Sequence, residues 1–348
     1  MRAMKPILIG LLVPNWADKK KHLELHQPYN KSNLELFAFS RKDISWKNRR
    51  IHGLHQQDGE FRDKSFPFPD AVYNRCYNRK KNRFFIRLEK AIGKNKCFNA
   101  VNRFEKWAVY NSLSTAGLVD YLPETQIYTE KELMAMLEAY RQVFVKASLG
   151  YKGTEVYRLE LEPNGNVYIS FHTMVRRLLC KQGDSLDAKL ADYLSPDKQY
   201  LVQQGIESAN IDRHLFDIRV LVQKDGRGQW AVSSSVCRLA LKYFYNTSQI
   251  RAIYEIETLA SKHFSPAFLN TLNTTSLAVA RVLELNYGLL GELSVDFILD
   301  RADKLWLIEV NGFPQKRLYK GIKDFRHAEA VFGRPLEYAS YLARNFTD

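Results

Sequence analysis

The chain has 348 residues, of which 45% are hydrophobic and 13% aromatic. This apolar content excludes a largely disordered protein, and the length favours two or three lobes around a cleft over one small core. The net charge is +14, and residues 1–100 alone hold 22 Lys and Arg against 9 Asp and Glu, a net of +13. This basic N-terminal part is either a solvated surface or one that attracts an anionic substrate, polymer or nucleic acid.

The only apolar run near the start, Pro6 to Pro14, predicts a buried first strand. It is too short to span a bilayer and no small-residue cleavage site follows it, so we expect no membrane partner. The four cysteines are widely spaced and form no C-x-x-C pair, which argues against a zinc site or a disulfide framework. We therefore expect a cytoplasmic protein.

A second lobe is predicted to begin near Val101, where Phe104 to Ala116 has helical composition. A helix at Glu130 to Tyr140 follows, and then strands at Val143 to Ala147 and at Glu155 to Leu161. These elements predict a small α+β lid.

From Tyr200 onward the chain is rich in β-type runs, namely LVQQGI, FDIRVLVQ, QWAVSSSVCRLA, LSVDFIL and LWLIEV. Helical stretches near Ala252 to His263 and Thr275 to Tyr287 separate them, and Gly288 fits a helix C-cap. Strands mixed with helices on separate lobes predict the α+β class rather than a doubly wound sheet.

The most informative stretch is GELSVDFILDRADKLWLIEVNGFP, in which two apolar strands flank a polar connection of four residues. A hairpin of that kind pairs Asp300 with Leu305, and therefore Asp296 with Glu309. Residues two apart on a strand share a face, so Asn311 joins the two acids.

Two carboxylates opposite each other among apolar residues should repel, and a hard cation removes that repulsion. Mg²⁺ accepts carboxylate and amide oxygens and keeps positions for phosphate oxygens and water. The spacing therefore predicts that Asp296, Glu309 and Asn311 hold Mg²⁺ beside a nucleotide. The alternative is a hairpin whose acids face solvent or pair with Arg and Lys.

A lysine and a glycine-containing loop suit phosphate binding. Lys146 lies in the apolar strand VFVKA, directly before the loop SLGYKGT, which contains Gly150 and Gly153. Small residues let backbone N–H groups approach phosphate oxygens. Alone, the same pattern also fits an exposed strand lysine before an ordinary hairpin.

The run LVQQGIE, Leu201 to Glu207, suits an adenine held by backbone groups and a ribose held by Glu207, or else is a plain strand end. No P-loop, dinucleotide-binding or protein-kinase motif is present in the sequence, so those nucleotide-binding classes are disfavoured. Arg219 and Arg238 end or interrupt core strands, where they either bind phosphate or a substrate carboxylate or form a salt bridge with Asp217.

In order, the segments FNAVNRFEKW, LPET, VFVKASLGYKG, YLVQQGI, FDIRVLVQ, CRLA and GELSVDFILD...WLIEVNGFP resemble the ATP-grasp superfamily. They are most similar to its YheC/YheD-like branch of endospore coat-associated proteins. The resemblance implies an ATP-grasp fold in which two α+β lobes clasp ATP behind an α/β N-terminal domain. It divides the chain into a basic N-terminal domain (1–100), a small lobe with linker helix and phosphate loop (101–200) and a C-terminal lobe with the metal site (201–348).

The resemblance also assigns roles to residues. ATP phosphates would be held by Lys106, Lys146, Ser148, Gly150 and Gly153, and adenine and ribose by Gln203, Gln204, Ile206 and Glu207. Mg²⁺, or Mn²⁺ in its place, would lie on Asp296, Glu309 and Asn311, and the catalytic arginines would be Arg219 and Arg238. Two segments depart from the branch: LALKYFYNTSQI replaces a Gly-Gly element, and GFPQK replaces the commoner SKPG.

The resemblance implies an ADP-forming carboxylate–amine ligase that acts through an acyl phosphate, with small-molecule or peptide substrates that the basic lobe suggests are anionic. The alternative is an ATP-binding protein associated with the spore coat that retains little or no turnover. Nucleic-acid binding through Arg75 to Arg87, interleaved with Tyr77, Phe84 and Phe85, is a third and less favoured interpretation.

Overall fold

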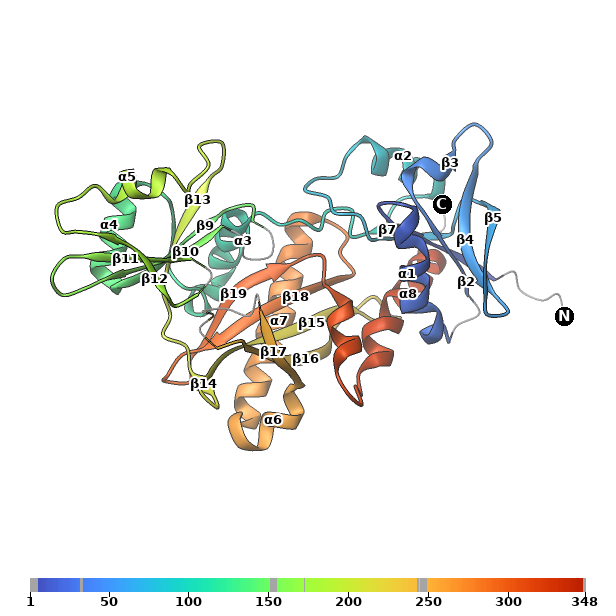
Figure 1. Cartoon of the computed structure of the whole chain (residues 1–348). Coiled ribbons are helices and arrows are strands. Elements are labelled where there is room, and N and C mark those ends of the chain that lie inside the picture. The colour runs from blue at the N-terminus through green and yellow to red at the C-terminus, as the bar shows by residue number, and fades with distance from the viewer. Residues whose placement is uncertain are drawn as a thin grey trace.

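The computed structural model describes residues 6–31, 34–150, 155–171, 173–242, 244 and 249–346. The described chain forms three sheets that follow one another in sequence, which we call the N-terminal, central and C-terminal sheets. In Figure 1 the N-terminal sheet and the central sheet lie at opposite ends of the molecule, with the C-terminal sheet between them.

The N-terminal sheet has the order β3-β4-β2-β1-β6-β7, with β5 paired to β4. Its strands are β1 (Ile7–Leu12), β2 (Leu34–Phe39), β3 (Ile44–Ser45), β4 (Arg50–Gln57), β5 (Glu60–Pro67), β6 (Ala71–Asn74) and β7 (Cys97–Phe98), and its helices are α1 (Trp16–His26), α2 (Arg83–Ile92) and α8 (Ala328–Asn345). The predicted first strand is β1, which pairs in parallel with β2 and β6. Ile9 packs in a core with residues of α1 and α8, whereas Leu12 packs in another with residues of α2. Burial on both faces explains the unbroken apolar run.

The central sheet is antiparallel, with the order β12-β11-β10-β9-β13-β8. Its elements are β8 (Thr125–Ile127), α4 (Glu130–Tyr140), β9 (Gln142–Ala147), β10 (Val156–Leu161), β11 (Val167–Phe171), β12 (Arg176–Cys180), α5 (Leu186–Ala191) and β13 (Tyr200–Gln204). The predicted bounds of α4 are confirmed, because Thr129 caps its first turn and Arg141 ends it in a left-handed conformation. Leu137 of α4 is buried against Val143 and Leu159 of the strands.

The C-terminal sheet is also antiparallel, with the order β17-β16-β15-β18-β19 and β14 paired to β15. Its elements are α3 (Lys106–Leu113), β14 (Asn210–Ile211), β15 (His214–Lys224), β16 (Trp230–Ala240), β17 (Ile250–Glu255), α6 (Ile256–His263), α7 (Pro266–Tyr287), β18 (Glu292–Leu299) and β19 (Leu305–Asn311). Val109 and Leu113 of α3 pack in the core of this sheet, although α3 precedes the central sheet in the chain.

Three predicted helices need correction. The helix predicted at Ala252 to His263 is wrong in its first part, because β17 occupies residues up to Glu255 as the neighbour of β16 and α6 begins only at Ile256. The helix predicted from Thr275 begins earlier, at Pro266, where Ser265 supplies the cap. The α-helix predicted from Phe104 covers only Lys106–Leu113 and continues as a π-helical turn. The C-cap role of Gly288 is confirmed, since its φ is +81° and its N–H donates to the carbonyl of Glu284.

The N-terminal and C-terminal sheets are joined by a buried ionic cluster around Glu292 of β18. Its carboxylate lies 2.5 Å from the Arg75 guanidinium and 2.7 Å from Lys316 Nζ, and accepts a hydrogen bond from Gln223 at 2.9 Å. Burial alone would raise the pKa of Glu292, but the two cations lower it to about 2. Arg75 also donates to the carbonyl of Pro314 at 3.0 Å, which ties the loop after Asn311 to the N-terminal sheet.

The boundaries at residues 100 and 200 stay a prediction, and the second falls at the start of β13, which belongs to the central sheet. All four cysteines are buried with free thiols. Among the described helices, none combines the length and the apolar character needed to cross a membrane.

Candidate active site

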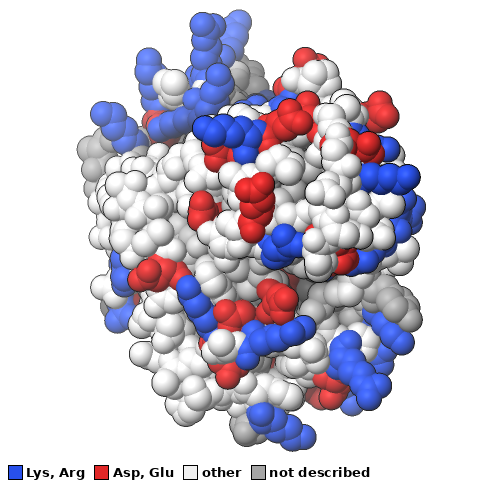
Figure 2. Space-filling model, turned by 90° about the vertical axis from the view of Figure 1, so that its left-hand side faces the viewer, with Lys and Arg blue, Asp and Glu red and all other residues white. Residues whose placement is uncertain are grey.

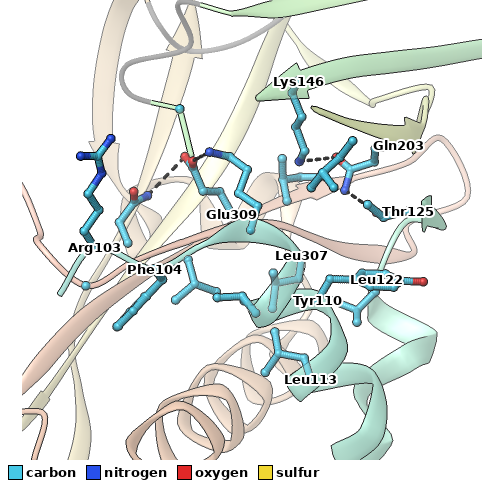
Figure 3. A pocket seen from close by; sticks show the side chains of 18 of the residues that line it. Arg103, Phe104, Tyr110, Leu113, Leu122, Thr125, Lys146, Gln203, Leu307 and Glu309 are labelled. Atoms are coloured by element: carbon cyan, nitrogen blue, oxygen red, sulfur yellow. Dashed lines mark hydrogen bonds and ion pairs between the residues drawn. The ribbon is translucent and has the colours of Figure 1, made fainter. Parts of the chain in front are cut away.

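A cleft of about 750 Å³ lies between the central and C-terminal sheets, and a smaller pocket of about 50 Å³ between α3 and β19 adjoins it. The cleft collects most of the residues predicted for the site, namely Lys106, Lys146, Gly150, Gln203, Gln204, Ile206, Glu207, Arg219, Arg238, Asp296 and Glu309. Asn311 lines the smaller pocket, which is drawn in Figure 3. Ser148 lines neither, and Gly153 lies outside the described residues.

Lys146 projects from β9 and is buried. Its ammonium donates to the Gln203 side chain at 2.8 Å, and Gln203 in turn donates to the Thr125 hydroxyl at 3.0 Å (Figure 3). Burial, together with the positive charge of Lys106, lowers the pKa of Lys146 to about 7, against a smaller opposing effect of Glu309. An anion bound beside this ammonium would reverse that shift, so the position is suited to phosphate.

The loop after β9 lies against the first residue of α3. The backbone N–H of Lys106 donates to the carbonyl of Ser148 at 3.0 Å. Lys106 Nζ lies 3.5 Å from the point that a β-carbon on Gly150 would occupy, so the ammonium lies directly beside this loop. Within the described residues the Ser148 hydroxyl is buried without a hydrogen-bond partner. Lys106, Ser148 and Gly150, which the resemblance assigns to the ATP phosphates, therefore lie close together.

The end of β13 forms another wall of the cleft. A β-carbon on Gly205 would lie 2.7 Å from the carbonyl oxygen of Gln142, to which the Gly205 N–H donates at 2.9 Å, so only glycine fits. Ile206 lines the cleft, and Glu207 is exposed at its edge, 3.0 Å from Arg301. The position of Glu207 is compatible with a ribose contact, which stays a prediction.

The predicted pairing of Asp296 with Glu309 is confirmed. The predicted tip of the hairpin is not, because Leu299 rather than Asp300 pairs with Leu305. A β-bulge after Asp296 makes up the difference of one residue and restores the predicted register at the site.

The repulsion that we expected at Asp296 is removed by two arginines. Arg219 binds both oxygens of Asp296, at 2.7 and 2.6 Å, and Arg238 reaches one of them at 3.1 Å. Arg238 is itself held by both oxygens of Asp217, at 2.6 Å each. Burial alone would raise the pKa of Asp296, but the two guanidinium groups lower it. The salt-bridge interpretation of these arginines is therefore confirmed.

Glu309 is less firmly held than Asp296. Its oxygens lie 3.4 Å from Lys106 Nζ and 3.3 Å from the Asn311 amide nitrogen, and 37% of its side chain is exposed to the cleft. These contacts are longer than a good charge-assisted hydrogen bond, so the carboxylate is free to bind a cation. Asp296 keeps one unused lone pair, on Oδ1, because its Oδ2 already accepts from both Arg219 and Arg238. This set of oxygen donors fits Mg²⁺ or Mn²⁺.

Sequence reasoning missed Thr125 and Ile308. Thr125 positions Gln203 because β8 and β13 pair, and nothing in the LPET segment indicates that partner. Strict alternation would turn Ile308 away from Glu309, but the bulge brings it to the cleft. Neither the pairing of β8 with β13 nor the position of the bulge can be predicted from the residues next to them in the sequence.

Residues 94–342 match the family described as YheC/D like ATP-grasp. The endospore coat-associated protein YheD of Bacillus subtilis (strain 168) is 26% identical over 326 residues, which cover 88% of this chain and 70% of YheD. The chain also resembles the crystal structure of D-alanyl-alanine synthetase A from Vibrio cholerae O1 biovar eltor, with a TM-score of 0.56, 14% identity and 99% of each chain covered. The ATP-grasp ligase PsnB, in complex with a precursor variant, Mg and ADP, gives a TM-score of 0.57 at 12% identity, with 97% of this chain and 100% of PsnB covered. These likenesses confirm the predicted α+β fold of the ATP-grasp type.

Proposed function

Because the chain belongs to the YheC/D like ATP-grasp family, we propose that it is an ADP-forming ligase that joins a carboxylate to an amine. The observation that carries this proposal is the convergence of Lys106 and Lys146, from two different elements, on the same cleft as Asp296 and Glu309. Phosphoryl transfer needs positioning and the cancellation of negative charge more than covalent help from the protein. The solved ligases of the same fold support the reaction class.

In this proposal ATP lies along the cleft. Its adenine would contact Ile206 and the backbone of Gln203 and Gln204, and its ribose would contact Glu207. Its phosphates would contact Lys106 and the loop that contains Ser148 and Gly150. The buried ammonium of Lys146 would neutralise phosphate charge.

Asp296, Glu309 and Asn311 would hold Mg²⁺, or Mn²⁺ in its place. A bound cation would supply charge neutralisation at the β- and γ-phosphates. Asp296 is fixed by Arg219 and Arg238, whereas Glu309 is free to adjust when the nucleotide enters.

The two arginines would face the transferred group. A carboxylate oxygen of the first substrate attacks the γ-phosphorus, and the bond from that phosphorus to the β–γ bridging oxygen breaks, which releases ADP. The amine of the second substrate then attacks the acyl carbon, phosphate leaves with the bonding electrons, and the amine loses a proton. Arg219 and Arg238, held in place by Asp217 and Asp296, would stabilise the negative charge on the acyl phosphate.

Purified protein tests the proposal. Millimolar Mg·ATP should raise the thermal unfolding temperature, since a hundredfold excess over Kd stabilises by about 2.7 kcal/mol. ADP release should require both an acid and an amine from a panel, and should be lost in Glu309→Ala but kept in Glu138→Ala, which removes an exposed carboxylate from α4. Absence of any nucleotide-dependent shift would refute the proposal at its first step.

A second candidate function is an ATP-binding protein of the spore coat with little or no turnover. It is favoured by the name of the relative YheD and by the segment LALKYFYNTSQI, which departs from the branch and lies partly outside the described residues. ATP binding without ADP formation across the whole panel, together with recovery in the insoluble coat fraction of spores, would favour this candidate over the ligase.

A further inference from the structure

The basic excess of the chain is concentrated on one surface of the N-terminal sheet. Residues 41–50 and 77–94 together hold twelve Lys and Arg against two acidic residues. The two segments touch, since Arg41 donates to the side chain of Asn78 at 2.7 Å. We call this surface the basic face. In Figure 2 Lys and Arg side chains project from the upper, more distant part of the molecule, the height at which Figure 1 places α2.

Charges within the basic face do not compensate one another. Both of its acids are already paired, Asp43 with Lys19 at 2.8 Å and Glu89 with Lys81 at 2.5 Å. Seven of its basic side chains are exposed and form no ion pair, hydrogen bond or ring contact within the part of the chain that the structure describes, namely Lys42, Lys47, Arg79, Lys80, Arg83, Lys90 and Lys94. The surface therefore presents a fixed positive potential to solvent.

Trp46 and Phe84 of the basic face are each contacted by one of its arginines, whereas Tyr77 is 44% exposed. The Arg87 guanidinium lies 4.1 Å from the centre of the Trp46 ring, and the Arg41 guanidinium 4.7 Å from that of Phe84. Phe85 is fully buried. Single-stranded nucleic acids bind by stacking bases on open aromatic faces, which these contacts occupy. Guanidinium groups held in this way suit carboxylates, which they bind through two parallel hydrogen bonds.

The basic face continues into the candidate active site. Tyr77 packs edge-on against Phe313 with ring centres 5.0 Å apart, and the Arg103 guanidinium lies 5.8 Å from the centre of the Tyr77 ring. Tyr77 and Arg103 line the pocket of Figure 3 together with Glu309. A chain that lies on the basic face can therefore reach the cleft without leaving the protein surface.

From these observations we propose that the basic face binds an acidic segment of a peptide substrate and guides its reactive end to the cleft. The assignment of the peptide as a substrate rests on the proposed ligase function. The binding surface itself does not depend on turnover.

Fluorescence anisotropy with a fluorescein-labelled peptide of ten glutamates, in the absence of ATP, tests the proposal. The native protein should bind this probe, and Arg79→Glu/Lys80→Glu/Arg83→Glu should weaken binding at least tenfold. The matched control is Lys131→Glu/Lys181→Glu/Lys189→Glu, which makes the same change of net charge on exposed positions of the central sheet and its helices. It should change the affinity less than threefold. Equal losses in both variants would overturn the proposal, because net charge alone would then explain binding.

Two further measurements complete the test. A labelled oligo-thymidylate of matched charge should bind more weakly than the glutamate peptide at the same salt concentration, and tighter binding would replace the proposal with nucleic-acid recognition. The Mg·ATP thermal shift is measured separately on the native protein and on the Arg79→Glu/Lys80→Glu/Arg83→Glu variant. If the native protein shows no thermal shift, the ligase proposal is refuted, and peptide binding alone then decides the role of the basic face. A thermal shift in the variant shows that the variant is folded.

Discussion

Binding of Mg·ATP should be coupled to protonation of Lys146. The pKa of this ammonium is about 7 in the ligand-free protein, against an ordinary value near 10.5, because burial and Lys106 disfavour its charge. Phosphate oxygens beside it would restore the charged form, so the complex holds a proton that part of the free protein lacks. At pH 7 about half of the free protein carries neutral Lys146, and at pH 8 about nine-tenths does.

The expected proton uptake is therefore about 0.5 per ATP at pH 7 and about 0.9 at pH 8. If only the charged form binds, the affinity falls roughly a hundredfold between pH 6 and pH 9. Isothermal titration calorimetry in two buffers of different ionisation enthalpy measures the uptake directly.

Lys146→Arg is the matched control, because an arginine stays protonated throughout this range. Its affinity for Mg·ATP should change little between pH 7 and pH 9. If the native protein takes up no proton at pH 8, or if Lys146→Arg shows the same loss of affinity with pH, Lys146 does not contact the phosphates and the reasoning fails.

Two further predictions concern residues that hold the site in place. Glu292→Gln should lower the free energy of unfolding by about 3–5 kcal/mol, since it leaves the buried cations Arg75 and Lys316 without their partner; chemical denaturation measures the change, and a loss below 1 kcal/mol would contradict it. Asp217→Asn should release Arg238 and slow ADP formation about tenfold, an effect of about 1.4 kcal/mol on the barrier, while Kd for Mg·ATP stays within twofold. Equal effects of Asp217→Asn on Kd and on the rate would instead assign the Asp217–Arg238 pair to nucleotide binding.

The sequence predicted the hairpin of β18 and β19 because the information for it is local. Alternation along two strands and a polar turn predict the pairing of Asp296 with Glu309. The predicted register was wrong by one residue at the tip of the hairpin, and the bulge after Asp296 compensates for this difference. The edge strand β17 was predicted as a helix because its short run has no alternation of its own and becomes a strand only beside β16.

Pairings between distant segments could not be predicted. The strand order β16-β15-β18 decides that Arg219 meets Asp296 while Arg238 meets Asp217, and no local pattern distinguishes these partners. The contact of Lys146 with Gln203 likewise follows from the pairing of β9 with β13. Residue types thus indicated the chemistry of the site, and topology determined which groups are already neutralised.

Packing of α8 on the N-terminal sheet has a consequence for synthesis on the ribosome. Leu336 and Leu342, which pack in the same core as Ile9 and Leu11, are translated at least 325 residues after them. Until then α1 covers that face of the sheet without α8, and the part that α8 covers exposes apolar surface of the kind that favours aggregation. Chains released before α8 is complete should therefore depend on chaperones or be degraded, even though their nucleotide cleft is already encoded in full.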